Sequence, residues 1–300
     1  MQPLRHLRLL AAASLFGALG CTGSLMDGTD EPGHGDGSGG GPGDEGPDGG
    51  GGDGSPAVSM ERLVVQSQVE PFRGDQPDLP GDAAVEMVQR ALGEEGFDAA
   101  VDGWFGSETA AVYADWQASL GYSGLAANGI PGPASLAALA EGRFQVEDEI
   151  QVGSRTAFSG QTVNQRTRVM LAEAESILGH DVVLSQGSYN PGGVGASAGT
   201  HDGGGAVDVS VSDLGTTQRW ETVKALRTVG FAAWFRTPDQ GPWPYHIHAI
   251  AIGDTDLSIA ARNQVADYYV GRNGLASHAA DDTPDAYRVP FTWWEKYSGN

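Results

Sequence analysis

Two segments of the chain carry residues of the types that hold metal ions. THDGGGAVDV spans residues 200–209, and YHIHAIAI spans residues 245–252. In the first segment His201 and Asp208 lie seven positions apart, and the three glycines between them lead into an alternating, β-branched run. That run predicts a strand, so Asp208 is expected on a strand that follows a tight glycine loop.

The second segment predicts a strand with two histidines on one face. Side chains alternate along a strand, so His246 and His248 should project from one side while Tyr245 and Ile247 project from the other. Two histidines and one carboxylate from two strands suit tetrahedral Zn²⁺ with the fourth position left to water, the usual composition of a catalytic zinc site. A histidine and an aspartate at this spacing, or two histidines on one strand, also occur in proteins that bind no metal. The presence of both segments in one chain favours a metal site.

The same residues resemble a known family. HDGGGAVD, followed about forty residues later by WPYHIH, resembles the zinc D,D-carboxypeptidases of the Hedgehog/D,D-peptidase group, and the resemblance extends over roughly residues 160–295. It implies that His201, Asp208 and His248 are the zinc ligands and that His246 is the catalytic histidine. It also implies an antiparallel-sheet zinc peptidase domain, which we expect over residues 146–300.

Two departures from the family pattern concern catalysis and substrate choice. Some branches have a Glu three residues before the last histidine ligand, where this chain has Tyr245, so no carboxylate base is assigned. Carboxypeptidases of the group commonly have an Arg before the first histidine that clamps a terminal carboxylate. Here that segment, residues 182–193, reads VVLSQGSYNPGG and contains no Arg. Cleavage at a chain end and within a chain both stay open, and the substrate-binding residues are unknown.

Upstream, apolar residues recur at three- and four-residue steps in three segments. These segments, residues 84–97, 101–122 and 127–140, give a helix, loop, helix, loop, helix pattern in which DGWFG and NGIPGP are the predicted turns between the helices. Their pattern resembles the peptidoglycan-binding domain that is commonly attached to bacterial wall hydrolases. We therefore expect a small three-helix peptidoglycan-binding domain over residues 56–145.

The remaining elements predict an α+β fold for the C-terminal domain. Helices are expected over residues 164–179, 216–230 and 258–271, and a strand over residues 231–237 that leads toward the histidine strand. The sheet formed by the predicted strands is expected to be antiparallel.

The N-terminus has the pattern of a secretory signal peptide. Arg5 and Arg8 precede a short apolar run with a small-residue end, which predicts a signal peptide over residues 1–20. Cys21, the single cysteine of the chain, follows directly and resembles the lipidated cysteine of a bacterial lipoprotein, which implies a membrane anchor. Cleavage by the ordinary signal peptidase without lipidation is the alternative.

The segment after the cysteine predicts a tether. Residues 22–55 contain 15 glycines and eight acids and almost no aliphatic side chains, so they cannot bury a core. We therefore expect residues 21–55 to be the lipidated cysteine and a disordered tether. The protein is expected to be exported to the cell envelope, at the outer membrane or in the periplasm if the cell has an outer membrane.

The charge of the chain restricts its partners. The net charge of −22 becomes −24 without the signal peptide, because Arg5 and Arg8 are lost and no acid is. Nucleic acid is therefore not expected as a partner. Peptidoglycan is also anionic, so its binding must depend on short-range recognition.

These features predict an exported zinc metallopeptidase that hydrolyses peptide bonds in peptidoglycan stem peptides or cross-links, as a D,D-carboxypeptidase or an endopeptidase. The alternative from another class is a non-catalytic peptidoglycan-binding lipoprotein whose zinc site is structural. A third hypothesis keeps the zinc site and cleaves another bond of the wall, such as the amide next to the sugar. The sequence does not separate this bond from a peptide bond.

Overall fold

The computed structural model describes residues 55–71 and 82–299. The predicted signal peptide, Cys21 and all but the last residue of the predicted tether lie outside the described residues. All of the described residues fall within one compact unit of the chain. The principal elements, in chain order, are β1 (Ala57–Ser59), α1 (Met60–Val69), α2 (Ala83–Glu94), α3 (Ser107–Ser119), α4 (Pro133–Ala140), β2 (Gln145–Glu147), β3 (Arg155–Phe158), β4 (Gln161–Asn164), α5 (Gln165–Leu178), β5 (Leu184–Gln186), β6 (Ala206–Ser210), α6 (Thr216–Thr228), β7 (Phe231–Arg236), β8 (His246–Ala251), α7 (Ile259–Tyr269) and α8 (Trp294–Ser298).

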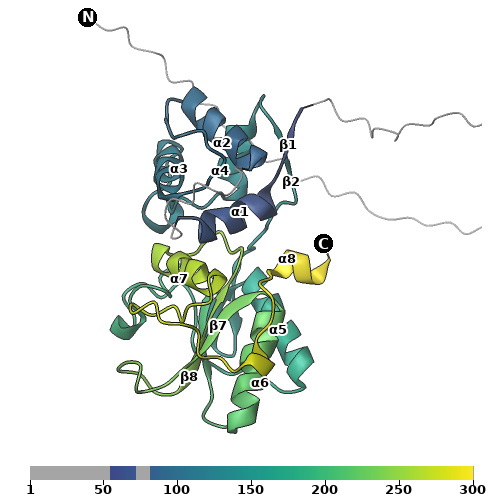
Figure 1. Ribbon diagram of the computed structural model, residues 1–300, viewed down its shortest axis with the longest axis vertical. Helices are drawn as coiled ribbons and strands as arrows, with labels where there is room; N and C mark the ends of the chain where they lie inside the picture. The colour runs from purple at the N-terminus through teal and green to yellow at the C-terminus, as the bar shows by residue number, and fades with distance from the viewer. Residues whose placement is uncertain (1–54, 72–81, 300) are drawn as a thin grey trace, which may run out of the picture. The chain divides into compact units, whose positions relative to one another are not determined.

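A four-stranded sheet organises the C-terminal part of the chain (Figure 1). Its strand order is β5-β6-β8-β7, and every neighbouring pair is antiparallel. The expectation of an antiparallel sheet within an α+β fold is therefore confirmed. The predicted helices 164–179, 216–230 and 258–271 correspond to α5, α6 and α7, with ends that differ by at most two residues.

One face of the sheet is apolar along its whole length. On β6 and β8 the side chains at odd-numbered positions, such as Val207, Val209, Ile247 and Ala249, are fully or almost fully buried. They form a core with the buried residues of α5 and α6, which lie together on that face in Figure 1. Because alternate side chains of a strand share a face, this core also fixes which residues face the other way.

The opposite face changes from apolar to polar along the strands. At one end Ala206, Ala232 and Ile250 join a second core with residues of α7 and of the helical segment before the sheet. Two positions further along β6, the same face carries Asp208 in place of an apolar residue. On β8 the corresponding residue is His248, two positions from Ile250 on the same face. The sheet therefore presents its polar side chains where the second core ends.

The helices α2, α3 and α4 agree with the three helices predicted upstream, and their aromatic residues pack inward. Phe105 and Tyr113 are fully buried, and Trp116 is 7% exposed. The sequence analysis did not predict α1. Its signals are nevertheless present, since the Ser59 side chain caps its first turn and its apolar residues follow at helical spacing. β1 and β2 form a short parallel pair, and the boundary predicted after residue 145 lies inside β2.

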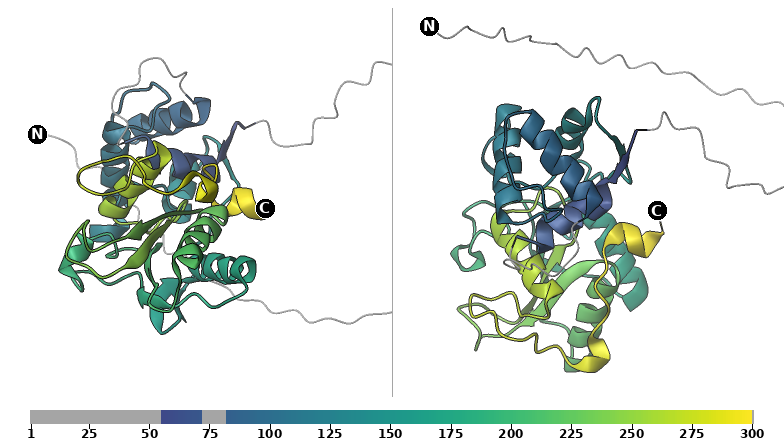
Figure 2. Two further views of the ribbon diagram at one scale, coloured as in Figure 1. Left: turned by 60° about the horizontal axis from the view of Figure 1, so that its bottom comes forward. Right: turned by 45° about the horizontal axis from the view of Figure 1, so that its top comes forward.

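Two amide side chains connect this helical segment to the loop that follows β8. Gln68 of α1 donates to the backbone oxygen of Asp254 and accepts from the backbone nitrogen of Gly253, both at 2.9 Å. Asn128 donates to the backbone oxygens of Thr255 at 2.9 Å and Leu257 at 3.0 Å. α1 also contacts α7, and the two helices lie side by side in Figures 1 and 2. The loop at residues 253–258 is thus held from the helical side.

None of the helices in residues 55–71 and 82–299 has both the length and the apolar run needed to cross a membrane.

We predict that Asn128→Ala destabilises the protein. Asn128 is 6% exposed, and its loss leaves the buried carbonyls of Thr255 and Leu257 without their donor, which costs about 1–3 kcal/mol. The free energy of unfolding measured in urea tests this. Gln151→Ala, which removes an exposed amide, is the control and should change it by less than about 0.5 kcal/mol. Equal effects of the two substitutions would contradict the role given to Asn128.

Candidate metal centre

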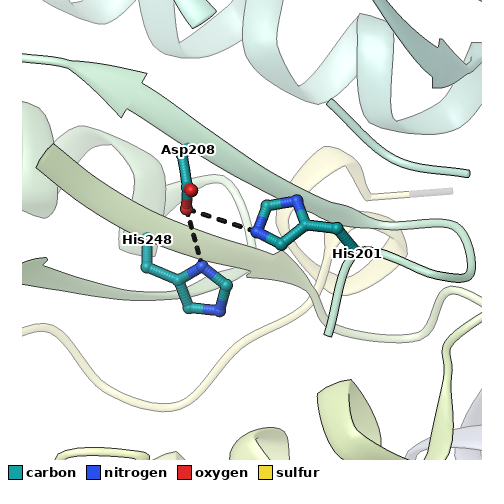
Figure 3. Close-up of side chains that lie close together, drawn as sticks. All are labelled: His201, Asp208 and His248. Atoms are coloured by element: carbon teal, nitrogen blue, oxygen red, sulfur yellow. Dashed lines mark hydrogen bonds and ion pairs between the residues drawn. The ribbon is translucent and has the colours of Figure 1, made fainter. Parts of the chain in front are cut away.

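Three predicted ligands meet on the polar part of the sheet (Figure 3). Asp208 on β6 and His248 on β8 are direct cross-strand partners, and the Oδ1 of Asp208 lies 2.8 Å from the Nδ1 of His248. His201 comes from the loop before β6 and places its Nε2 3.3 Å from the same oxygen. The structure therefore brings together His201, Asp208 and His248, which the sequence predicted as a set.

The glycine loop positions His201 by close backbone packing. The backbone oxygen of His201 accepts from the nitrogen of Asn190 at 2.9 Å, and the nitrogen of Gly204 donates to the oxygen of Asp256 at 2.7 Å. A Cβ at Gly203 would overlap that same oxygen of Asp256, and Gly205 has a φ of 73°, which side chains disfavour. The three glycines thus let this loop lie directly against the loop that follows β8.

Hydrogen bonds set the protonated nitrogen of each ligand histidine. The Nδ1 of His201 lies 2.9 Å from the backbone oxygen of Gly187, and the Nε2 of His248 lies 2.8 Å from the Oε1 of Gln264. Because both partners are carbonyl oxygens, which only accept, these nitrogens carry the hydrogens. The second nitrogens, the Nε2 of His201 and the Nδ1 of His248, face Asp208. In a protonated imidazole such a nitrogen donates to the carboxylate, and in a neutral imidazole it presents the lone pair that binds a metal ion.

The charges of the ligands also suit a cation. Burial disfavours the charged form of Asp208, but the hydrogen bonds and charges of His201 and His248 outweigh it and hold its pKa well below the usual range. Burial lowers the pKa of His248 to about 4. At neutral pH the carboxyl is therefore ionised and the imidazole neutral, which are the forms that bind metal ions.

The distances fit a single metal ion. The three ligand atoms all lie within 4.8 Å of one another, and bonds of about 2.0–2.2 Å from a tetrahedral centre place ligand atoms about 3.3 Å apart. Three protein ligands would leave a coordination position of such an ion to water or substrate, as in catalytic zinc sites. His201, Asp208 and His248 could therefore hold a metal ion.

His246 stands beside this set but outside it. It pairs across the sheet with Ser210, and its Nδ1 donates to the backbone oxygen of Pro244 at 2.8 Å. Its Nε2, the lone-pair atom, lies 3.8 Å from the Oδ1 of Asp208, further away than either ligand nitrogen. His246 therefore directs a basic nitrogen toward the site without belonging to the ligand set.

The site opens into a cavity of about 610 Å³. Besides the four residues predicted from the sequence, its lining includes Gln186, Arg219, Arg236, Trp243 and Gln264. The sequence analysis did not predict any of these five as site residues. Gln264 lies on α7, in a segment predicted as a helix, and nothing in its local sequence indicates a partner for His248.

The buried carboxyl group of Asp254 holds the residue that binds the glycine loop. Asp254 is fully buried, and its Oδ2 accepts from the Nδ2 of Asn164 at 2.6 Å. Its Oδ1 accepts from the backbone nitrogen of Asp256, the residue whose own oxygen binds Gly204. Burial, helped by the charge of Asp256, raises the pKa of Asp254 to about 6.

His278 forms a separate pair with an acidic residue. Its Nδ1 lies 2.7 Å from the Oδ2 of Asp267, and its side chain is 44% exposed. Among the described residues, the set of three possible metal ligands is His201, Asp208 and His248, and this pair is not part of it.

Comparison with known proteins identifies one segment of the chain. Residues 81–139 match the model of a peptidoglycan binding domain family. Searches of curated proteins and of solved structures each gave no match. The chain therefore contains a peptidoglycan-binding domain, built from α2, α3 and α4, and this domain indicates a peptidoglycan partner and a cell-envelope location.

We predict that the metal content depends on the ligand set. The wild type should retain about one metal ion per chain after equilibration with Zn²⁺ and desalting, because the three ligands converge only in the folded protein. His201→Ala and Asp208→Ala should reduce this to near zero, whereas His278→Ala, which removes the histidine paired with Asp267, should not. Elemental analysis measures the content. Equal metal in the wild type and His201→Ala would refute the assignment.

We also predict a pH-dependent stability contribution from Asp254. Its pKa is about 6 in the folded protein against an ordinary value of 3.8, so between these values the unfolded chain loses the proton first. The stabilisation that the protonated Asp254 gives to the folded protein is therefore fully present below pH 3.8 and is lost as the pH rises through 6. The loss amounts to about 3 kcal/mol.

The difference in unfolding free energy between wild type and Asp254→Asn isolates this effect. The part of the destabilisation by Asp254→Asn that does not depend on pH is the same at every pH. The unfolding free energy of Asp254→Asn should therefore rise relative to that of the wild type between pH 4.5 and pH 7. Asp285→Asn, at a side chain that is 95% exposed, is the control. A difference that does not change with pH would show that Asp254 is not responsible.

Proposed function

We propose that the protein is an exported zinc-dependent peptidase that hydrolyses peptide bonds in peptidoglycan stem peptides or cross-links. The observation that carries the proposal is a His–Asp–His set in a cavity beside a third imidazole, that of His246, on a chain with a peptidoglycan-binding domain. Export and lipidation of Cys21 stay predictions from the sequence.

The donor set supports zinc as the metal. Imidazole and carboxylate ligands suit Zn²⁺, and His201, Asp208 and His248 would hold it. Bound there, zinc supplies a Lewis acid that polarises a carbonyl and lowers the pKa of water toward neutrality. Gly187 and Gln264 orient the two imidazoles, and the cavity admits a substrate to the open side.

His246 is the residue proposed to move a proton. Its Nδ1–H is fixed by Pro244, so the Nε2 is the nitrogen that can take a proton from the attacking water and give it to the leaving amine. In the protonated state the same nitrogen is a donor that can stabilise negative charge on the carbonyl oxygen. With Tyr245 in place of a glutamate, this imidazole is the base assigned to the reaction.

The alternative, a binding protein with a structural metal, makes a different prediction about chemistry. Structural zinc sites usually have four protein ligands, whereas three are proposed here. The two functions are separated by mass spectrometry of purified muropeptides after incubation with the protein lacking residues 1–20, with and without a chelator. Products that appear only without the chelator support the peptidase, and their masses identify the bond. Cleavage next to the sugar would move the assignment to an amidase. Intact muropeptides under both conditions would favour the binding protein.

We predict that the two histidines of β8 can be separated by mutation. His246→Ala should retain metal but slow hydrolysis by about 10²- to 10⁴-fold, the range for a positioned acid or base. His248→Ala should lose both metal and activity, because it removes a ligand. Elemental analysis alongside turnover of a soluble muropeptide measures the two effects. A His246→Ala protein without metal, beside a His248→Ala protein that retains it, would reverse the roles.

A further inference from the structure

Four aromatic side chains form a row that begins at the cavity. The ring of Tyr245 stacks on that of Phe235, with the centroids 5.7 Å apart. Phe235 meets Trp220 edge to face at 5.5 Å, and Trp220 stacks on Tyr287 at 6.2 Å. These four side chains, the aromatic row, come from the residue before β8, from β7, from α6 and from the short 3₁₀ helix η3 (Asp285–Tyr287). The fold therefore brings together rings that lie far apart in the sequence.

The aromatic row is partly exposed along its whole length. Tyr245 is 50% exposed, and Phe235, Trp220 and Tyr287 are each half-buried. Phe235 and Trp220 also pack against the core formed with α5 and α6. Because Phe235 covers one face of the Tyr245 ring, the exposed surface of that ring lies on its other face and its edge. Contiguous apolar surface of this kind marks binding sites, whereas single exposed apolar residues need no explanation.

The cavity of the metal ligands extends to the aromatic row. Tyr245 and Arg219 line the cavity together with His246. Tyr245 and His246 are neighbours in sequence at the start of β8, so their side chains point to opposite sides of the sheet. The cavity therefore reaches around the start of β8, from the metal ligands to the first ring of the row. The Arg219 guanidinium borders this passage, 5.4 Å from the centroid of the Tyr245 ring.

The charges beside the aromatic row favour a neutral ligand. Arg219 and Lys224 of α6 each donate to a backbone oxygen, and Arg288 lies 3.5 Å from a carboxylate oxygen of Asp285. These cations thus already have partners within the protein. The row therefore offers ring faces to a ligand rather than a charge that would attract the carboxylates of a stem peptide.

From this arrangement we infer that the aromatic row binds the N-acetylated sugars of the peptidoglycan strand while the attached stem peptide enters the cavity. The inference rests on the proposed function. The polymer is the partner that the domain at residues 81–139 indicates, and its sugars are neutral rings. A pyranose ring presents C–H groups on its flat sides, and these pack against the electron-rich faces of aromatic rings. The C-terminal domain then recognises the glycan separately from the peptidoglycan-binding domain.

The dimensions of the polymer fit this arrangement. A stem peptide extends at most about 14 Å from its sugar to the bond that follows its fourth residue. The aromatic row begins at Tyr245, next to His246, and its successive rings are 5.5–6.2 Å apart. A sugar on the row can therefore stay attached to a peptide whose far end lies at the metal ligands.

The test compares two ligands that differ in the sugar. The tetrapeptide L-Ala-γ-D-Glu-L-Lys-D-Ala is prepared with an N-acetyl group or joined to N-acetylglucosaminyl-N-acetylmuramic acid, and each form is titrated calorimetrically into zinc-loaded protein. Both forms lack the D-Ala-D-Ala bond, and cleavage of the corresponding pentapeptides is followed in parallel. The wild type should bind the disaccharide form about 3- to 10-fold more tightly, the range for a contact with an aromatic ring.

Tyr245→Ala should abolish this preference by weakening binding of the disaccharide form. Tyr269→Ala is the matched control, because Tyr269 is 42% exposed and also packs on a phenylalanine, Phe291, but does not line the cavity. This control should retain the preference of the wild type. Circular dichroism checks that both variants fold. Should Tyr245→Ala not fold, Tyr245→Leu keeps an apolar side chain on Phe235 without the ring and should show a reduced preference.

The outcomes separate this inference from the proposed function. A preference for the sugar that depends on Tyr245, without cleavage of either pentapeptide, would support the aromatic row and refute the peptidase. Equal binding of the two tetrapeptide forms by the wild type, or no binding of either, would overturn the inference even if both pentapeptides are cleaved. A preference that persists without the Tyr245 ring would also overturn it and would assign the sugar to the peptidoglycan-binding domain.

Discussion

The register between β6 and β8 is the constraint on which the site depends. It pairs Asp208 with His248 while Val209 and Ile247, one residue along each strand, remain in the core with α5 and α6. A shift of either strand by one residue would bury a charged or polar ligand among these apolar side chains and turn a valine or isoleucine toward the cavity. Packing of the apolar face therefore fixes the positions on the strands from which the ligands project.

The part of the site that follows local periodicity could be predicted from the sequence. The alternation of YHIHAIAI places His246 and His248 on one face, and the glycines after His201 indicate a tight loop before the strand of Asp208. The helices α2, α3 and α4 were predicted for the same reason, because apolar residues recur in their segments at a fixed period, whereas α5, α6 and α7 were predicted from local helix signals. α1 was missed although its capping residue and spacing were available.

The rest of the site could not be predicted because it depends on contacts between residues far apart in the chain. Gln264 contacts His248 because α7 folds back over the sheet. The residues around Gln264 in the sequence predict a helix but do not indicate this contact. Arg236 was read as part of a strand. That its guanidinium would lie beside His246, under the backbone of residues 273–274, follows from the β7–β8 register and the later loop together. The absence of an arginine before the first histidine therefore did not settle whether the cavity has one.

The loop at residues 253–258 joins the wall-binding part of the molecule to the metal ligands. On one side it accepts hydrogen bonds from Asn128, which lies within the peptidoglycan-binding domain, and from Gln68. On the other side the backbone oxygen of Asp256 holds Gly204, three residues after His201. Because both sets of hydrogen bonds are made to the same short segment, a movement of the peptidoglycan-binding domain cannot leave this segment in place unless the hydrogen bonds of Asn128 break. The position of the first ligand thus depends on packing by the domain that binds the polymer, although that domain contributes no ligand.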